Sequence, residues 1–345
     1  MITRYTVSRD DSIYEAWPDL VKNSRGELIC IFTECKFHLD RKGVSLMMTK
    51  SFDKGKTWTP KEVFVKSPND VHTYNCARIS SLSDGRLAVI CDIGIDMTGK
   101  DESLVSEQHV WFSSDDGDTW EGPTVIPFRG IVPDKYQILS NGRHLFGIHR
   151  ANDIGKLEQY AYYSDDGGKT WNETLVAYDP ALKLCEVSIV EVKPGTLVAF
   201  MRENSKLGLP CKKAISYDYG TSWEGIYDTN IECCHRPVVG FYDKDKLMMT
   251  YRYSQGGLAK MHDRFQNLFC AFFDTDAALA KNLADNKTRI FPLHYDRSTM
   301  ADTGYSGWVR LEDGSFYVVN YTVDDAPKAY IVGYSFTLDD VIIEA

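Results

Sequence analysis

The sequence has no apolar run near the roughly 18 residues that a membrane-spanning helix needs. No apolar segment follows the N-terminal MITRYTVSRDDS either, so we expect no signal peptide. Positive charge is scarce, because 39 Lys and Arg stand against 49 Asp and Glu, and the net charge is −10. We therefore expect no binding to nucleic acid and none to an anionic membrane.

Metal-binding and disulfide patterns are also missing. The nine cysteines are odd in number, and no two have CxxC spacing. Cys233 and Cys234 are adjacent and precede His235, which is not the spacing of a zinc site, so packing is their simplest role. We expect reduced, mostly buried thiols in a cytoplasmic protein, with no metal or organic cofactor.

Aromatic residues are plentiful, with 20 Tyr and 7 Trp. They favour strands or a site that stacks against rings. An eight-residue segment, here called the octet, has Ser, Asp, Gly and Trp at its first, third, fifth and eighth positions. It occurs at residues 51–58, 113–120, 164–171 and 216–223. Such a segment suits a turn, because the Asp can accept backbone N–H groups and the Gly can take a positive φ.

A second pattern is a tight turn between two apolar runs. The turn residues are Gly26, Gly85, Gly142, Gly195, Asp245 and Gly314. Six such hairpins predict six units, each with a third strand and most with an octet and a fourth strand. We predict an all-β, six-bladed β-propeller with four-stranded antiparallel blades, formed as one domain by residues 1–345.

The pattern changes at two places. An Ala-rich segment, residues 276–286, stands where the fifth octet would be and predicts a short helix. The strand-like segment 329–340 has no fourth strand after it, and residues 2–7 precede the first blade. We therefore predict that residues 2–7 pair in the sixth blade.

Counting from each turn gives two sets of positions that should share one end of the blades. Nine residues before the turns stand Trp17, Cys76, Pro133, Glu186, Arg236 and Tyr305. Seven residues after them stand Thr33, Asp92, His149, Arg202, Arg252 and Tyr321. These sets are too polar for a core and predict a concave site. A shift of a residue or two in the third blade would replace Pro133 by Lys135 or Tyr136.

The octet resembles the Asp box, or BNR repeat, of the sialidase superfamily, and the resemblance covers nearly the whole chain. The segment CEVSIVEVKPGTLVAFMRE resembles that family's glutamate strand, with Glu186, and the middle arginine of its arginine triad, Arg202. Tyr305-Ser306, before an Asp-Gly turn, resembles the nucleophile strand. Asp40 lies where the family keeps its acid/base aspartate. The Asp box itself implies the fold and not the chemistry.

The resemblance implies an exo-acting glycoside hydrolase that cleaves a terminal sugar bearing a carboxylate by a retaining mechanism. Asp40 would be the acid/base, Tyr305 the nucleophile and Glu186 its base. A neutral Tyr hydroxyl suits this task, because a carboxylate nucleophile would be repelled by the carboxylate of the sugar. The residues expected to bind the substrate are Arg202, Arg236, Arg252, His149, Asp92 and Trp17.

The chain departs from the family in the arginine triad. The first arginine position falls on Ala16, and the third has no clear match. Arg236 and Arg252 could take part in binding, or they could pair with Asp243 or Asp245. The sugar and its linkage stay open.

Two other function classes also stay open. The first is another enzyme on the same propeller, either a different exo-glycosidase or a polysaccharide lyase. A lyase would use His149, Tyr305 and the arginines to remove a proton beside a uronic carboxylate. A non-catalytic glycan-binding propeller would keep Arg and Trp without turnover. Tyr305 could instead pack between blades, and Asp40 could be a solvated loop charge. The expected partner is a carbohydrate in each case, and the oligomeric state is undetermined.

Overall fold

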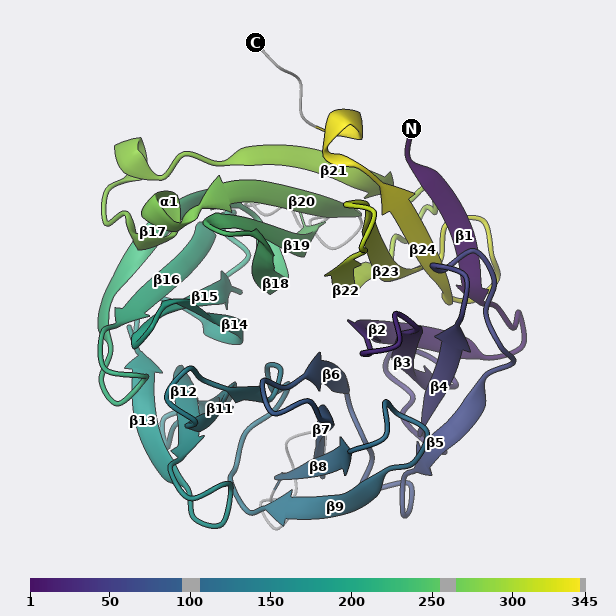
Figure 1. Cartoon of the computed structure of the whole chain (residues 1–345), viewed down its shortest axis with the longest axis horizontal. Coiled ribbons are helices and arrows are strands. Elements are labelled where there is room, and N and C mark those ends of the chain that lie inside the picture. Colours follow the sequence, from purple (N-terminus) through teal and green to yellow (C-terminus); the bar gives the residue numbers. More distant parts are fainter. Residues whose placement is uncertain (95–105, 255–264, 342–345) are drawn as a thin grey trace. The chain divides into compact units, whose positions relative to one another are not determined.

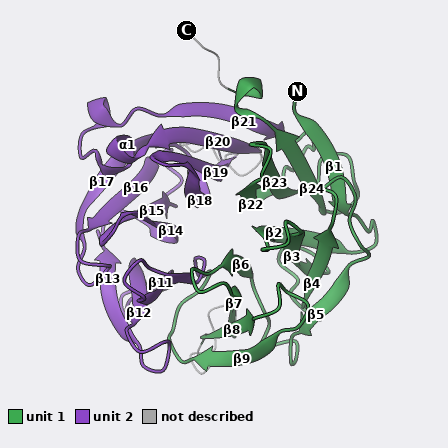
Figure 2. Cartoon of the chain, in the orientation of Figure 1, with its two compact units in different colours: residues 1–132, 296–345 green, residues 133–295 purple. Residues whose placement is uncertain are grey.

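The computed structural model describes residues 1–94, 106–254 and 265–341 (Figure 1). Their strands form six four-stranded antiparallel sheets, which are the blades of a six-bladed β-propeller and confirm the predicted fold class. The chain divides into two compact units (Figure 2). Unit 1 is Met1–Val132 with Asp296–Ala345, and unit 2 is Pro133–Tyr295. The single domain of 345 residues stays a prediction.

Unit 1 holds blades 1, 2 and 6. Blade 1 consists of β2 (Tyr14–Lys22), β3 (Leu28–Cys35), β4 (Ser45–Ser51) and β5 (Glu62–Lys66). Blade 2 consists of β6 (Arg78–Ser81), β7 (Leu87–Ile93), β8 (Glu107–Ser113) and β9 (Glu121–Ile126). Blade 6 consists of β22 (Thr303–Arg310), β23 (Phe316–Thr322), β24 (Tyr330–Phe336) and β1 (Thr3–Ser8). The antiparallel pairing of β1 with β24 confirms that the N-terminal strand completes blade 6.

Unit 2 holds blades 3, 4 and 5. Blade 3 consists of β10 (Gln137–Ile138), β11 (His144–Ala151), β12 (Leu157–Ser164) and β13 (Asn172–Ala177). Blade 4 consists of β14 (Leu184–Lys193), β15 (Thr196–Glu203), β16 (Pro210–Ser216) and β17 (Glu224–Glu232). Blade 5 consists of β18 (Cys234–Asp243), β19 (Lys246–Ser254), β20 (Gln266–Asp274) and β21 (Arg289–Tyr295). Between β20 and β21, α1 (Thr275–Leu279) and a 3-10 turn (Leu283–Asp285) confirm the predicted short helix. A further 3-10 turn, Leu338–Asp340, follows β24 in unit 1.

All four octets adopt one turn. In the first, Asp53 Oδ1 accepts the N–H of Thr57 at 2.8 Å, and Ser51 Oγ accepts the N–H of Gly55 at 2.8 Å. The other three repeat these bonds, and the fifth-position glycines have φ of 81–88°. Trp58 also packs against Tyr317 of blade 6, with ring centroids 6.0 Å apart. The predicted turn role of the aspartate is thus confirmed.

Buried aspartates connect the first strands of neighbouring blades. In unit 1, Asp19 Oδ2 accepts the N–H of Ile79 at 2.9 Å. In unit 2, Asp134, which precedes β10, accepts the N–H of Ile189 through Oδ2 at 2.7 Å. These bonds fix the height of one first strand against the next, and a buried carboxylate held in this way strongly disfavours a register slip.

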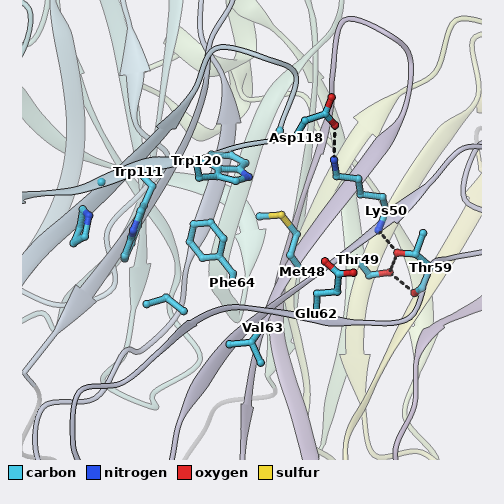
Figure 3. A pocket seen from close by; sticks show the side chains of 14 residues that line it. Met48, Thr49, Lys50, Thr59, Glu62, Val63, Phe64, Trp111, Asp118 and Trp120 are labelled. Atoms are coloured by element: carbon cyan, nitrogen blue, oxygen red, sulfur yellow. Dashed lines mark hydrogen bonds and ion pairs between the residues drawn. The ribbon is translucent and has the colours of Figure 1, made fainter.

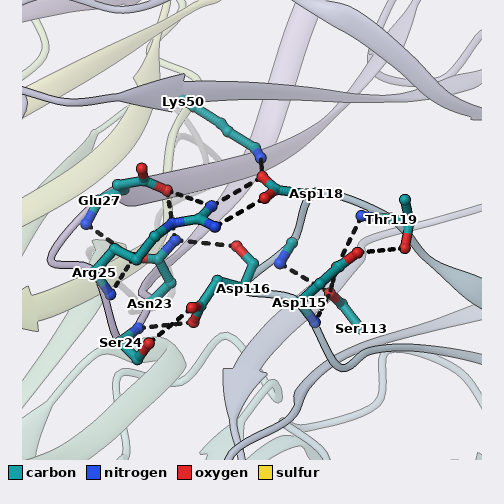
Figure 4. A network of polar contacts seen from close by, with 11 residues as sticks. Asn23, Ser24, Arg25, Glu27, Lys50, Ser113, Asp115, Asp116, Asp118 and Thr119 are labelled. Atoms are coloured by element: carbon teal, nitrogen blue, oxygen red, sulfur yellow. Dashed lines mark hydrogen bonds and ion pairs between the residues drawn. The ribbon is translucent and has the colours of Figure 1, made fainter.

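At the octet end of unit 1, charged side chains join blade 1 to blade 2 (Figure 4). Arg25, in the β2–β3 turn, donates to both carboxylate oxygens of Asp118 at 2.8 Å. Ser24 Oγ donates to Asp116 Oδ2 at 2.7 Å. Bidentate arginine–carboxylate geometry fixes orientation as well as distance, so these contacts align the two blades.

Among the described residues, no helix is long and apolar enough to cross a membrane. All nine cysteines are buried and none forms a disulfide, as predicted.

Candidate active site

The positions nine residues before the turns share an irregular backbone. Trp17, Glu186, Arg236 and Tyr305 have φ of 54°, 39°, 51° and 55°. Each lies where the pairing register between the first and second strands shifts. A left-handed non-glycine residue costs about 1–3 kcal/mol and tends to occur at functional sites, where bulges also redirect side chains. Its recurrence in four blades marks each of these positions as a candidate functional residue.

The second strand of each of these blades ends level with the bulge in the first strand. In each of these four blades, the residue before the bulge pairs with the position seven residues after the turn. The pairs are Ala16 with Thr33, Cys185 with Arg202, His235 with Arg252, and Gly304 with Tyr321. Within each blade the counted positions therefore lie together, as predicted.

The third blade is shifted, but in the direction opposite to the one considered. Its left-handed residue is Val132, with φ of 54°, one position before Pro133. Lys135 and Tyr136 do not take the slot. Tyr136 instead packs against the octet residue Trp171, with ring centroids 5.9 Å apart, at the octet end of the blade.

Unit 2 brings together three of the predicted residues, Glu186, Arg202 and His149. Arg202 Nη1 donates to Glu186 Oε2 at 2.8 Å, and its Nη2 donates to Asn204 Oδ1 at 2.7 Å. The backbone N–H of Glu186 donates to His149 Nδ1 at 3.2 Å. Burial, assisted by Arg202 and Arg236, lowers the pKa of His149 to about 4. The imidazole is therefore neutral at pH 7, and its proton lies on Nε2 because Nδ1 accepts a bond.

The three predicted arginines differ in exposure. Arg236 is fully buried, and its Nη2 donates to the carbonyl of Pro133 at 3.0 Å. Arg252 is 5% exposed and lies opposite His235 in the ladder. Burial, with the charges of Arg202 and Arg252, lowers the pKa of His235 well below its usual value. With 13% of its side chain exposed, Arg202 is the most accessible of the three to a ligand.

The sequence left open that Arg236 or Arg252 pairs with an aspartate in the turn of blade 5, and for Asp245 this pairing is not seen. Asp245 lies 3.4 Å from Lys246 and pairs with neither Arg236 nor Arg252. Arg264, which follows further along the chain, lies outside the described residues.

Unit 1 surrounds Trp17 with residues that counting from the turns did not find. The guanidinium carbon of Arg41 lies 3.8 Å from the centroid of the Trp17 ring, and Arg41 Nη2 donates to Asn75 Oδ1 at 2.9 Å. The His38 ring meets Trp17 edge-on at 5.1 Å. Arg41 thus stacks on the residue that follows Ala16, the position where the resemblance expects the first arginine of the triad.

A carboxylate with three partners completes this cluster. Asp302 Oδ2 bonds His38 Nδ1 at 2.8 Å and also accepts from the Tyr14 hydroxyl, while Oδ1 accepts from the Tyr321 hydroxyl at 2.7 Å. Burial, with Tyr321 and Asp302, raises the pKa of Tyr14 well above its usual value. His38 and Asp302 were missed because they lie outside the hairpin strands, although the polar loop KFHLDRKG was a visible signal.

The remaining predicted residues of unit 1 have different environments. Asp40 lies in the same loop, with 34% of its side chain exposed and Lys36 at 3.5 Å. Asp92 is fully buried and accepts from Asn75 Nδ2 at 3.2 Å. Burial raises the pKa of Asp92 to about 6, despite that bond. Tyr305 is partly buried against the core of unit 1.

The predicted contact between Glu186 and Tyr305 stays a prediction, because Glu186 belongs to unit 2 and Tyr305 to unit 1. The residues that the structure describes contain no group of three or more His, Cys, Asp or Glu placed to hold a metal ion.

Known proteins provide an independent comparison. The family of BNR repeat-like domains matches residues 26–236. No curated protein matches the sequence significantly. A solved protein of unknown function from Dyadobacter fermentans DSM 18053 aligns with a TM-score of 0.79 and 20% identity, over 97% of this chain and 98% of that one.

Solved sialidases share the same architecture. The Hadza microbial sialidase Hz136 aligns with a TM-score of 0.74 and 17% identity, over 99% of this chain and 69% of that one. Trypanosoma rangeli sialidase aligns with a TM-score of 0.69 and 17% identity, over 97% of this chain but 59% of its own length. Identities this low show the fold alone, whereas the family match covers more than half of the sequence. The chain therefore belongs to the family of BNR repeat-like domains and has the six-bladed β-propeller fold of the sialidases.

Proposed function

We propose that the protein is an exo-acting glycoside hydrolase that removes a terminal sugar bearing a carboxylate, with retention of configuration. The observation that carries this proposal is the left-handed bulge shared by Trp17, Glu186 and Tyr305. These three residues bear the same strain at the same position of their strands, and their side chains are an indole, a carboxylic acid and a phenol. Strain kept at chemically active residues is typical of a site that must present them.

The proposed reaction has two steps. Tyr305 attacks the anomeric carbon while Glu186 accepts the phenolic proton, and Asp40 protonates the departing oxygen. Asp40 then takes a proton from a water molecule as its oxygen attacks the anomeric carbon. The bond from that carbon to Tyr305 breaks, and Glu186 returns its proton to the phenolate oxygen. The ion pair with Arg202 favours the carboxylate form of Glu186, which a base requires.

Arginines supply the recognition of the acidic group. Arg202 has a partly exposed guanidinium that can bind a carboxylate in bidentate geometry. We assign Arg41 the role that the resemblance gave to the position of Ala16. Its Nε and Nη1 have no hydrogen-bond partner among the described residues, and no described carboxylate lies within ion-pair distance. A buried guanidinium with unused donors favours an anionic ligand.

The test is a screen of chromogenic glycosides of sialic acid, of its deaminated analogue and of glucuronic acid. We expect one of these acidic glycosides, and no neutral one, to be hydrolysed. Tyr305→Phe should reduce turnover by at least 100-fold, as loss of a nucleophile does. Tyr160→Phe, a tyrosine on β12 whose hydroxyl bonds Glu158 at 2.6 Å, is the matched control and should leave turnover unchanged. Hydrolysis that survives Tyr305→Phe would refute the mechanism.

The lyase alternative receives less support from the geometry. A lyase of the predicted kind needs His149 as a proton acceptor, but Nδ1 already accepts the N–H of Glu186 and Nε2 carries the proton. A lyase product would show the ultraviolet absorbance of an unsaturated uronide, so the same screen separates the two reactions. A glycan-binding propeller would bind the sugars and turn over none of them.

The cellular location belongs to the same proposal. Nine buried cysteines without a disulfide fit a reducing compartment, which supports the cytoplasmic location expected from the sequence. Fractionation of the native cells would test it, and recovery of the protein outside the cytoplasm would refute it.

A further inference from the structure

Unit 1 has a cavity that the proposed reaction does not use. It has a volume of about 630 Å³ and lies between the outer strands of blades 1 and 2 (Figure 3). Its lining comes from β4 and β5 on one side, and from β8, the second octet and β9 on the other. Its β4 residues Met48, Thr49 and Lys50 lead toward the octet turn, whereas Ala16 and Thr33 pair at the other end of the blade. The cavity is therefore separate from the candidate active site.

Three aromatic rings form one wall. Phe64 lies 5.3 Å from Trp111 and 5.5 Å from Trp120, with the planes inclined at 70° and 85°. Rings inclined in this way make an open corner and not a closed stack. Phe64 and Trp120 are partly exposed, so apolar ring surface faces the cavity. Such surfaces bind the C–H faces of sugar rings through dispersion and the hydrophobic effect.

Polar groups line the opposite wall (Figure 3). Lys50 Nζ bonds Asp118 Oδ1 at 3.0 Å, so these two charges offset each other. Thr49 and Thr59 contribute hydroxyl groups that already bond one another, 3.2 Å apart. Glu62 is the remaining charged residue of the lining, and it is exposed. This wall can bond hydroxyl groups but disfavours an anion, because its surplus charge is negative.

Trp120 differs from the other octet tryptophans. The indole N–H groups of Trp58, Trp171 and Trp223 donate to the glycine carbonyl of their own octets at 3.1–3.2 Å. Trp120 Nε1 is buried and has no hydrogen-bond partner in the described structure. Its ring can therefore turn toward the cavity without breaking a hydrogen bond, and a ligand oxygen that accepted this N–H would satisfy a donor that is costly to leave unmade.

We propose that this cavity binds an uncharged sugar residue of a glycan, stacked on the aromatic corner and bonded through its hydroxyl groups to the polar wall. The site is distinct from the arginine-bearing positions proposed to hold an acidic sugar, and it does not depend on them. The lining has an apolar side and a polar side. A sugar ring fits both, because its C–H face can stack on the aromatic wall while its hydroxyl groups face the polar wall.

The test uses the indole N–H signals of the ¹⁵N-labelled protein. The signal that disappears in Trp120→Phe identifies Trp120, and it is followed while lactose, maltose or cellobiose is added to about 50 mM, well above a millimolar Kd. We expect at least one of them to shift this signal saturably, and glucuronic acid to leave it unmoved. The proposal is overturned if none of the three disaccharides moves it, or if glucuronic acid moves it equally.

Variants separate binding from general damage to the fold. By calorimetry, Trp120→Phe, which keeps a ring but removes the N–H, and Phe64→Ala should each weaken disaccharide binding at least fivefold. Trp171→Phe, the same change in an octet whose N–H is bonded, and Leu175→Ala, an exposed apolar residue on outer strand β13, should leave binding unchanged. Equal affinity in Phe64→Ala and in the wild type, with both folded, would refute the site.

Discussion

At the scale of single residues, the loop after β3 contains two groups able to transfer a proton, Asp40 and His38. Asp40 is partly exposed, whereas His38 is bonded to Asp302 at 2.8 Å. If Asp40 is the acid, Asp40→Asn should reduce kcat/KM by roughly 10²–10⁴-fold for a substrate with a sugar leaving group. A nitrophenyl glycoside needs little protonation and should lose far less. The comparison of the two substrates is the measurement, and a selective loss in His38→Gln instead would move the role to His38.

Glu186 and Tyr305 are expected to act as one unit. Tyr305→Phe and Glu186→Gln should each remove the same covalent step, so the double variant should lose little more than either single one. Single-turnover kinetics on the most active chromogenic substrate would show this. Additive losses in the double variant would mean that the two residues act independently, and the assignment of Glu186 as the base would fail.

The pH dependence of stability reports on Asp92. Its pKa in the folded protein is about 6, above the ordinary value of 3.8, because burial opposes the charge. Between pH 3.8 and about 6, the Asp92 carboxyl holds more protons in the folded state than in the unfolded state. The contribution of Asp92 to stability is therefore highest at low pH and is lost as pH rises through about 6. Asp92→Asn should raise the free energy of unfolding by about 2 kcal/mol at neutral pH and change it little near pH 4.

Urea unfolding at several pH values measures this effect, and Asp115 provides a control of opposite sign. Hydrogen bonds from Thr119 lower the pKa of the exposed Asp115 to about 2. Its contribution is present above the ordinary pKa and is lost as pH falls, so Asp115→Asn should destabilise the protein at neutral pH. Destabilisation by Asp92→Asn at neutral pH would contradict the prediction.

At the scale of elements, the octets stabilise the blades without taking part in chemistry. Trp171 packs on Phe146 at 5.3 Å between centroids and donates to the Gly168 carbonyl. Trp171→Ala should lower the free energy of unfolding by about 2–4 kcal/mol, because a partly buried ring is lost. Asp115→Ala should also lower Tm. Thermal melts and the kinetics of the folded fraction are the measurements, and a fall in kcat at unchanged Tm would contradict this role.

At the scale of the whole molecule, the N-terminal strand closes a sheet. β1 covers the edge of β24, with Thr3 opposite Ser335 and Thr6 opposite Val332. Deletion of residues 1–8 should expose the N–H and C=O groups of that edge, lower Tm and promote association through strand pairing. Light scattering and melting curves would test this. A truncated protein with the same association state and the same Tm as the intact chain would contradict it.

The sequence by itself determined the repeats, because their causes are local. An Asp and a Gly two residues apart in each octet suffice for the carboxylate bonds and the positive φ, and apolar runs on both sides of a turn suffice for a hairpin. The fixed pitch of a strand made the counted offsets meaningful, so Trp17, Glu186 and Tyr305 could be placed at one strand position. The N-terminal strand of blade 6 followed from counting strands.

Only the tertiary structure decided what surrounds those positions. Arg41 stacks on Trp17 from a loop, and Asp302 meets His38 across a separation of 264 residues, which no local pattern encodes. The left-handed bulges were also invisible in the sequence, since β propensity does not favour a positive φ at Glu186 or Tyr305. Burial then set the protonation of His149 and Asp92, because a charge is penalised by the packing of several strands and not by its neighbours in sequence.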